Sequence, residues 1–254
     1  MSHDVEQSLI APRYLAGGGD PGWITVPLHR ACGWSYGHDP LMPRAHLASP
    51  DQQAMLRIDP DPDGPWWKIR HAPASGQPAW SVSFGARTPV EIIAAFTDAL
   101  TAPGSVAVPA PDPYEPLRRA GWGEARDGEG LTSPDGYAHV EHFTQGVSDC
   151  WFIETAVSED PEGLIWKAYL SGTTPLHLIA AFTGALADEA PIARDRQHLP
   201  AHSRRHIRAS TRQLPAAAVA FALETRVKDL TARQRSTPTP GPRPPNVPPH
   251  RRAR

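Results

Sequence analysis

Two thirteen-residue segments decide how this chain is organised: TPVEIIAAFTDAL at 88–100 and TPLHLIAAFTGAL at 174–186. They agree at nine of thirteen positions. Their apolar residues recur at helical spacing, which predicts an amphipathic helix packed on a sheet. A Thr-Pro pair opens each segment. We expect Thr88 to cap the first helix and Glu91 to complete a capping box, whereas the second segment carries His177 in place of the glutamate.

The residues upstream of both segments repeat as well. LASPD at 47–51 matches LTSPD at 131–135 at an offset of 84 residues, and Trp67 keeps this offset from Trp151. Ordered matches of this kind are typical of internal repeats. We therefore assign two tandem repeats, residues 27–100 and residues 116–190.

Each repeat is predicted to be α-β-β-β-α. A short helix begins at Pro27 or Pro116, where a missing N–H costs nothing, and a Ser-Pro-Asp turn follows. The three strands alternate apolar and polar residues, and their apolar positions in the first copy are Ala54, Leu56, Ile58, Trp67, Ile69, Trp80, Val82 and Phe84. Three strands leave exposed edges and little core, so we expect an α+β fold in which the repeats pack as a pseudo-dimer.

The rest of the chain changes character around the repeats. Residues 1–195 hold 12 basic and 25 acidic side chains, whereas residues 196–254 hold 13 basic and 2 acidic ones. This asymmetry predicts a basic tail with a partner of its own. The remaining segments are a lead-in at 1–26, a Pro-rich linker at 101–115, a basic segment at 196–235 with a helix at about 215–235, and a disordered Pro/Arg-rich tail at 236–254.

The combination of the doubled Ser-Pro-Asp turn, the Gly-Trp before it, the tryptophan strands and the Thr-Pro helix resembles a known family. It is similar to the SPDY-motif domain of unknown function of actinomycete bacteria, which often occurs in two copies. APRYLAGGGD at 11–20 resembles the lead-in of such proteins. The first copy departs from the motif, because Gln52 and Gln53 follow its Ser-Pro-Asp, whereas the second copy has Tyr137 after Gly136. The resemblance implies no activity.

The Ser-Pro-Asp turns are interpreted as structural, although they contain a hydroxyl and a carboxylate. A serine nucleophile needs a base within hydrogen-bond reach, and no histidine recurs at a matching offset in the two repeats. No Gly-x-Ser-x-Gly elbow is present either. We therefore expect a protein that is not an enzyme and needs no cofactor. The turn residues are Ser49, Pro50, Asp51, Ser133, Pro134 and Asp135.

Two patterns suggest a metal, and both are set aside. The stretch at 59–64 opens like a calcium loop, but Arg70 stands where the loop needs a bidentate glutamate. Three histidines in the tail, at 198, 202 and 206, would share a helix face, but Pro200 lies among them. We expect no metal site.

Two features suggest binding. Trp66 alternates away from the core tryptophans and is a candidate partner contact. Arg204, Arg205, Arg208 and Arg212 would cluster on a helix, where they either bind nucleic acid or neutralise the acidic repeats of their own chain. The sequence thus leaves two functions open: a protein-interaction module with an unknown protein partner, and an accessory protein that binds nucleic acid through its basic tail.

The composition of the chain also bears on its cellular location. The chain of 254 residues has no run of 18 apolar residues, and residues 1–20 lack a basic start followed by an apolar core. We therefore expect no signal peptide, no membrane contact and a cytoplasmic location. Its 2 cysteines, Cys32 and Cys150, fit free buried thiols in a reducing environment.

Overall fold

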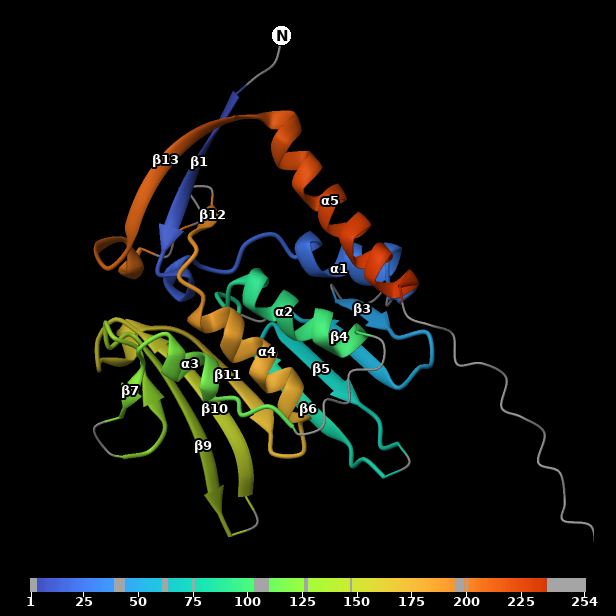
Figure 1. Ribbon diagram of the computed structural model, residues 1–254, viewed down its shortest axis with the longest axis horizontal. Coiled ribbons are helices and arrows are strands. Elements are labelled where there is room, and N and C mark those ends of the chain that lie inside the picture. The colour runs from blue at the N-terminus through green and yellow to red at the C-terminus, as the bar shows by residue number, and fades with distance from the viewer. Residues whose placement is uncertain are drawn as a thin grey trace, which may run out of the picture.

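A computed structural model of the chain describes residues 4–38, 44–60, 64–74, 76–102, 110–125, 128–146, 148–194, 199 and 201–236. The fold is α+β, as the sequence predicts, and its centre is a ten-stranded antiparallel sheet to which both repeats contribute (Figure 1). The strand order is β2-β3-β4-β5-β6-β11-β10-β9-β8-β7. The two repeats therefore meet edge to edge at β6 and β11, where Val82 faces Leu170 and Phe84 faces Ala168.

The elements of the first repeat are α1 (Gly22–Arg30), β2 (Ser35–His38), β3 (Ala45–Ala48), β4 (Ala54–Ile58), β5 (Trp67–His71), β6 (Trp80–Phe84) and α2 (Val90–Thr101). Those of the second are α3 (Glu115–Arg119), β7 (Gly123–Glu124), β8 (Leu131–Thr132), β9 (Ala138–Gln145), β10 (Ser148–Ala156), β11 (Leu164–Ser171) and α4 (Leu176–Ala187). Each repeat thus has five strands, and the predicted α-β-β-β-α order is wrong. The two additional strands precede the Ser-Pro-Asp turn and are too short for a clear alternating pattern.

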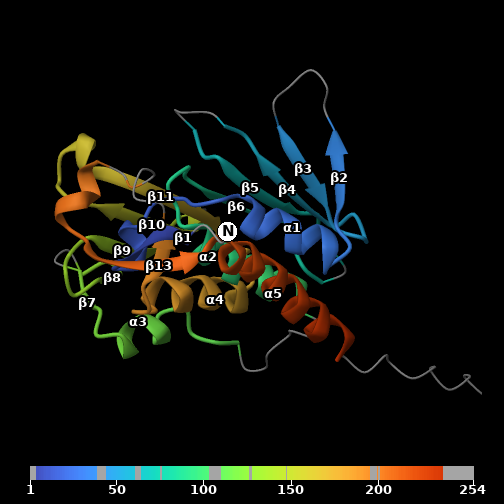
Figure 2. The same ribbon diagram turned by 90° about the horizontal axis from the view of Figure 1, so that it is seen from above.

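The helices cover one face of the large sheet. Figure 2 shows them together on one side of the strands. The alternating residues that point toward the helices are buried in one continuous core with α2 and α4, including Trp67 at 1% exposure, Trp151 at 3% and Trp166 at 3%. The stacked rings of Phe84 and Phe182 join the two repeats within it (5.3 Å between centroids). The tryptophans and alternating apolar residues are core, as the sequence predicts.

One predicted helix start and one predicted capping box are wrong. Helix α1 begins at Gly22, five residues before Pro27. The missing N–H of Pro27 leaves the Trp23 carbonyl without its helical donor, and Arg226 Nε donates to that carbonyl instead (3.0 Å). The capping box before α2 does not form, because no side chain caps this helix and Thr88 Oγ1 has no partner within the described residues.

The lead-in and the basic segment form a second, three-stranded sheet. Strand β1 (Asp4–Ala11) lies between β12 (Ile192–Arg194) and β13 (Arg208–Pro215), antiparallel to both. The basic segment, for which the sequence predicts only a helix, thus also contains the strand β13. Helix α5 (Ala216–Arg235) matches the predicted helix closely and runs from β13 to α1 (Figure 1). Residues 103–109 of the linker and residues 237–254 of the tail lie outside the described residues.

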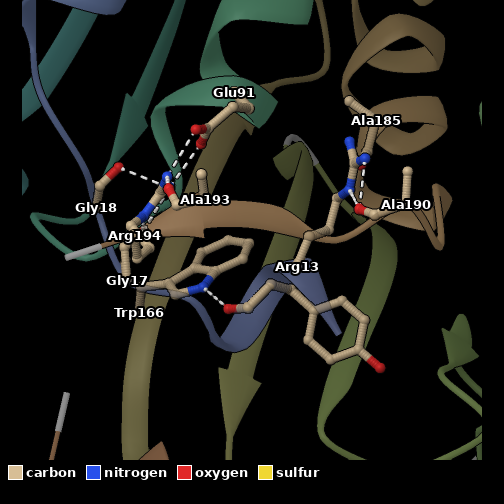
Figure 3. Close-up of polar contacts among 10 residues, drawn as sticks. Arg13, Gly17, Gly18, Glu91, Trp166, Ala185, Ala190, Ala193 and Arg194 are labelled. Carbon is tan, nitrogen blue, oxygen red and sulfur yellow. Dashed lines mark hydrogen bonds and ion pairs between the residues drawn. The ribbon is translucent and has the colours of Figure 1, made fainter. Parts of the chain in front are cut away.

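Two buried arginines attach this small sheet to the repeats (Figure 3). Arg13 lies in the short helix η1 (Arg13–Leu15) and donates to the Ala185 and Ala190 carbonyls (2.9–3.3 Å). Arg194 donates to both carboxylate oxygens of Glu91 at 2.6 Å. Glu91 thus pairs with an arginine 103 residues away instead of completing a capping box.

Candidate functional site

The face of the large sheet that no described helix covers is the most extensive candidate surface. Along the six central strands β4, β5, β6, β11, β10 and β9, alternate side chains point away from the helices, and most of these are exposed or half-buried, whereas Cys150 is buried. The antiparallel register lines these side chains up across the strands. We call this surface the open face.

Large apolar side chains lie on the open face. Phe152 is 44% exposed, Tyr169 38% and Met55 48%. The rings of Phe152 and Tyr169 pack edge to face at 5.5 Å, and Phe143 packs against Phe152 at 6.5 Å. These three aromatic residues come from β9, β10 and β11, so they form one contiguous group beside the junction of the repeats. Contiguous exposed apolar groups of this kind mark interaction sites.

Charge is unevenly distributed on the open face. The first repeat contributes basic side chains, and the second contributes Glu141 and Glu154 beside Lys167. On the basic side, the buried Asp59 pairs with Arg44 (2.8 Å), Arg57 and Lys68 (3.5 Å), leaving a net positive group. The hydrogen bond from Arg57 lowers the pKa of Asp59, so its carboxylate stays ionised at neutral pH. Arg70 adds a further exposed charge.

The two Ser-Pro-Asp turns have the same geometry. Ser49 Oγ donates to Asp51 (2.6 Å) and accepts from the Ala54 amide (2.9 Å). Ser133 Oγ donates to Asp135 (2.7 Å) and accepts from the Ala138 amide (2.9 Å). Each hydroxyl therefore closes a turn and donates its hydrogen bond to the carboxylate of that turn. These hydrogen bonds stabilise the turn, which accounts for both the serine and the aspartate structurally.

Trp66, the candidate partner contact, is not fully exposed on the surface. It is half-buried, precedes β5 and packs against the main core, so its exposed area for a partner is limited. The position that corresponds to it in the second repeat is Cys150, which is buried.

The four tail arginines do not share a helix. Arg204 and Arg205 lie in η4 (His202–Arg205), whereas Arg208 and Arg212 lie four residues apart on strand β13. All four are exposed, and none makes an ion pair with the part of the chain that the structure describes. Within the described residues, an ion pair between the tail and the repeats comes from α5 instead, where Arg226 pairs with Asp98 (2.7 Å).

The structure does not bring the two sequence-predicted metal candidates together into a site within the described residues. The described residues contain no group of three or more metal-binding side chains. His206 hydrogen-bonds the Tyr137 hydroxyl through Nδ1 (2.9 Å), while residue 198 and the side chain of residue 202 lie outside the description. Residues 61–63 of the calcium-like stretch lie outside it too.

Among the described helices, none combines the length and apolar character that crossing a bilayer requires.

The cysteines are free in the structure. Cys32 is half-buried and Cys150 is buried. Burial raises the pKa of both thiols, so neither is activated as a thiolate.

Sequence reasoning missed the open face and a contact of the lead-in. Tyr14 donates from its hydroxyl to Asp135 (2.6 Å), 121 residues away. No local sequence pattern indicates a contact between residues this far apart. The open-face aromatics could have been found, because Phe152 alternates with Trp151 and Ile153 and must therefore point away from the core.

The geometry defines a class of protein: an α+β protein built from two tandem repeats that share one sheet and leave one of its faces uncovered. The family is identified by comparison. A family model described as SPDY, domain of unknown function (DUF317), matches residues 48–106 and 132–192, which is consistent with two tandem copies of the SPDY domain. The chain matches no curated protein and no solved structure.

Proposed function

We propose that this protein is a non-enzymatic interaction module that assembles through the open face, and that a second copy of the chain is the partner this face fits. The observation that carries the proposal is the contiguous aromatic group of Phe143, Phe152 and Tyr169 on a sheet face that no described helix covers. Burying exposed apolar area stabilises association by about 25 cal/mol per Å² before the cost of ordering the partners.

Charge favours a second copy as the occupant. The open face is basic on the first repeat, around Arg57 and Arg70, and acidic on the second, at Glu141 and Glu154. A two-fold axis between two open faces would bring each basic half against an acidic half. Closed symmetric dimers use self-complementary patches of this type. A polyphosphate chain lying across the same face would instead meet both carboxylates.

The size of the open face also fits. Six strands about 4.8 Å apart and about 20 Å long present roughly 600 Å². Stable interfaces bury about 800 Å² per partner, and the flanking strands can supply the difference.

Self-association is tested on the full chain by sedimentation velocity. We expect the unchanged protein to be dimeric at tens of micromolar and Phe152→Glu to shift it to monomer, because a buried unpaired charge opposes the interface. Phe221→Glu is the matched control, since Phe221 is 60% exposed on α5, away from the open face, and should leave the dimer intact. The proposal would be contradicted if the unchanged protein is monomeric at about 100 micromolar. This concentration is roughly tenfold above the dissociation constant expected for a weak dimer.

A second candidate function, nucleic-acid binding, is favoured by the tail arginines. Arg204, Arg205, Arg208 and Arg212 are exposed and make no ion pair within the described chain, which speaks against neutralisation of the repeats by these four. Exposed arginines along one segment are typical of phosphate contacts.

If the tail binds nucleic acid, binding should depend weakly on sequence and steeply on salt. Neutralising about six phosphates gives a log–log slope near −5. Changing the four arginines to glutamine should weaken binding to all sequences alike and flatten this slope. The matched control changes four other exposed arginines, Arg70, Arg87, Arg118 and Arg119, to glutamine and should have a smaller effect. Equal losses in both variants would indicate attraction by overall charge alone.

A further inference from the structure

The second repeat holds a tyrosine in a defined cradle. Tyr14 donates to Asp135 Oδ2 (2.6 Å), and its ring packs edge-on against Trp122 (6.1 Å between centroids). Its side chain is buried, with 6% exposed. Desolvation by burial and the hydrogen bond to Asp135 both raise the pKa of Tyr14, so the hydroxyl stays protonated and donating. The lead-in segment thus inserts one phenol ring beside the Ser-Pro-Asp turn.

The first repeat builds the same cradle from equivalent residues. Trp34 corresponds to Trp122, and Asp51 corresponds to Asp135. The glycine before each tryptophan has a positive φ, 70° at Gly33 and 78° at Gly121. Both bonds that tie Asp51 to its turn, from Ser49 Oγ and the Gln53 amide, end on Oδ1, as the matching bonds of Asp135 do. Oδ2 is the oxygen that Tyr14 uses in the second repeat.

The first cradle contains a cavity instead of a ring. Its volume is about 310 Å³. Trp34, Ala54 and Leu100 give it apolar walls, Ser49 and Asp51 line it at the turn, and Gln234 of α5 closes one side. Pro50 and Asp51 are exposed, so the cavity opens to solvent beside the carboxylate. This volume lies at the small end of the roughly 300–1,000 Å³ range of ligand sites, which suits a single ring.

We propose that the cavity between Trp34 and the Ser-Pro-Asp turn of the first repeat binds a phenol ring whose hydroxyl donates to Asp51. The second repeat supplies the argument, because the same tryptophan, turn and carboxylate enclose a tyrosine there. Asp51 is an ionised acceptor at neutral pH, since the bond from Ser49 holds its pKa below the ordinary value. The occupant is the tyrosine side chain of another polypeptide segment. This inference does not depend on the open face.

The simplest probe is p-cresol, which is the side chain of tyrosine. Equilibrium dialysis of the full chain should find one p-cresol site, and Asp51→Asn should weaken it by tenfold or more, because a bond to a charged group is lost. Toluene lacks the hydroxyl and should bind the unchanged protein at least about tenfold more weakly than p-cresol. Equal affinities for both compounds would show a plain apolar void and overturn the proposal.

Tyr14→Ala provides the matched internal control. It empties the second cradle, so the stoichiometry of p-cresol should rise from one to two if the two cradles are equivalent. Asp135→Asn in that background should remove the added site and leave the first. If Tyr14→Ala does not fold, the toluene comparison on the unchanged chain still decides the matter.

A pentapeptide with the sequence of residues 12–16, Pro-Arg-Tyr-Leu-Ala, distinguishes the sources of the phenol. Tighter binding of this peptide than of p-cresol supports a polypeptide occupant, and replacing its tyrosine by alanine should abolish that binding. Binding of p-cresol without the peptide would assign the site to a free phenol and refute the polypeptide source. Cys32 lines the cavity, so an occupant should also slow its alkylation in a Cys150→Ser background.

Discussion

Replacing Arg194 by alanine is expected to lower the free energy of unfolding by about 3–5 kcal/mol, because it removes one partner of a buried ion pair. Arg194 is 6% exposed and donates to both oxygens of Glu91 at 2.6 Å. Its guanidinium also donates to the carbonyls of Gly17 (3.0 Å) and Gly18 (3.3 Å). The substitution leaves a carboxylate and two carbonyls without their donor. Urea titration followed by tryptophan fluorescence measures the loss.

The residues around Arg194 are packed too closely to move into the space that Arg194→Ala would leave. Gly19 has a φ of +92°, and a Cβ there would lie 2.9 Å from Val90 Cγ2 and 3.1 Å from Arg194 Cζ, so the lead-in packs directly on the guanidinium. The exposed pair of Arg118 with Asp112 is the control, and Arg118→Ala should cost at most about 1 kcal/mol. Replacing both buried partners, Arg194→Met with Glu91→Leu, should recover much of the loss. Equal effects of Arg194→Ala and Arg118→Ala would contradict this account.

The same ion pair shows why local sequence patterns identify only part of the fold. Thr88, Pro89 and Glu91 match a capping box within four residues, yet Glu91 binds an arginine from a distant strand. The Thr88 amide, to which Glu91 would bind in a capping box, donates instead to the Gly85 carbonyl (3.1 Å), and Glu91 makes the stronger, charge-assisted bidentate bonds to Arg194. The repeats and their inward faces were predictable because their pattern lies within each strand and helix.

The pairing of β1 with β13 had no such local signal. Ser8 faces Thr211 across about two hundred residues of chain, and the two strands carry few apolar positions. The spacing of Arg208 and Arg212 was also ambiguous, since residues four apart share a face of a helix and of a strand alike. The candidate site was also only partly predictable from the sequence. Alternation along β10 places Phe152 on the outer face, but the contact between Tyr14 and Asp135 joins residues far apart in the chain and is visible only in the folded structure.

Trp67→Ala is expected to lower the free energy of unfolding by about 3–5 kcal/mol, through lost burial and the cavity that remains. Trp67 is 1% exposed and faces Phe84 across the β5–β6 pair, so neighbouring strands cannot close the gap without losing register. Trp66→Ala is the matched control one residue earlier. Trp66 is half-buried and lies outside the strand, so its replacement should cost less than half as much.

The second repeat extends this test to the whole sheet. Trp151 is the counterpart of Trp67, 3% exposed and stacked on His142 at 4.4 Å, and Trp151→Ala should cost a similar amount. Because one core spans both repeats through Phe84 and Phe182, either substitution should lower the midpoint of a single cooperative transition, measured together by fluorescence and circular dichroism. Two separate transitions, with each variant shifting only one, would mean that the β6–β11 junction does not couple the repeats.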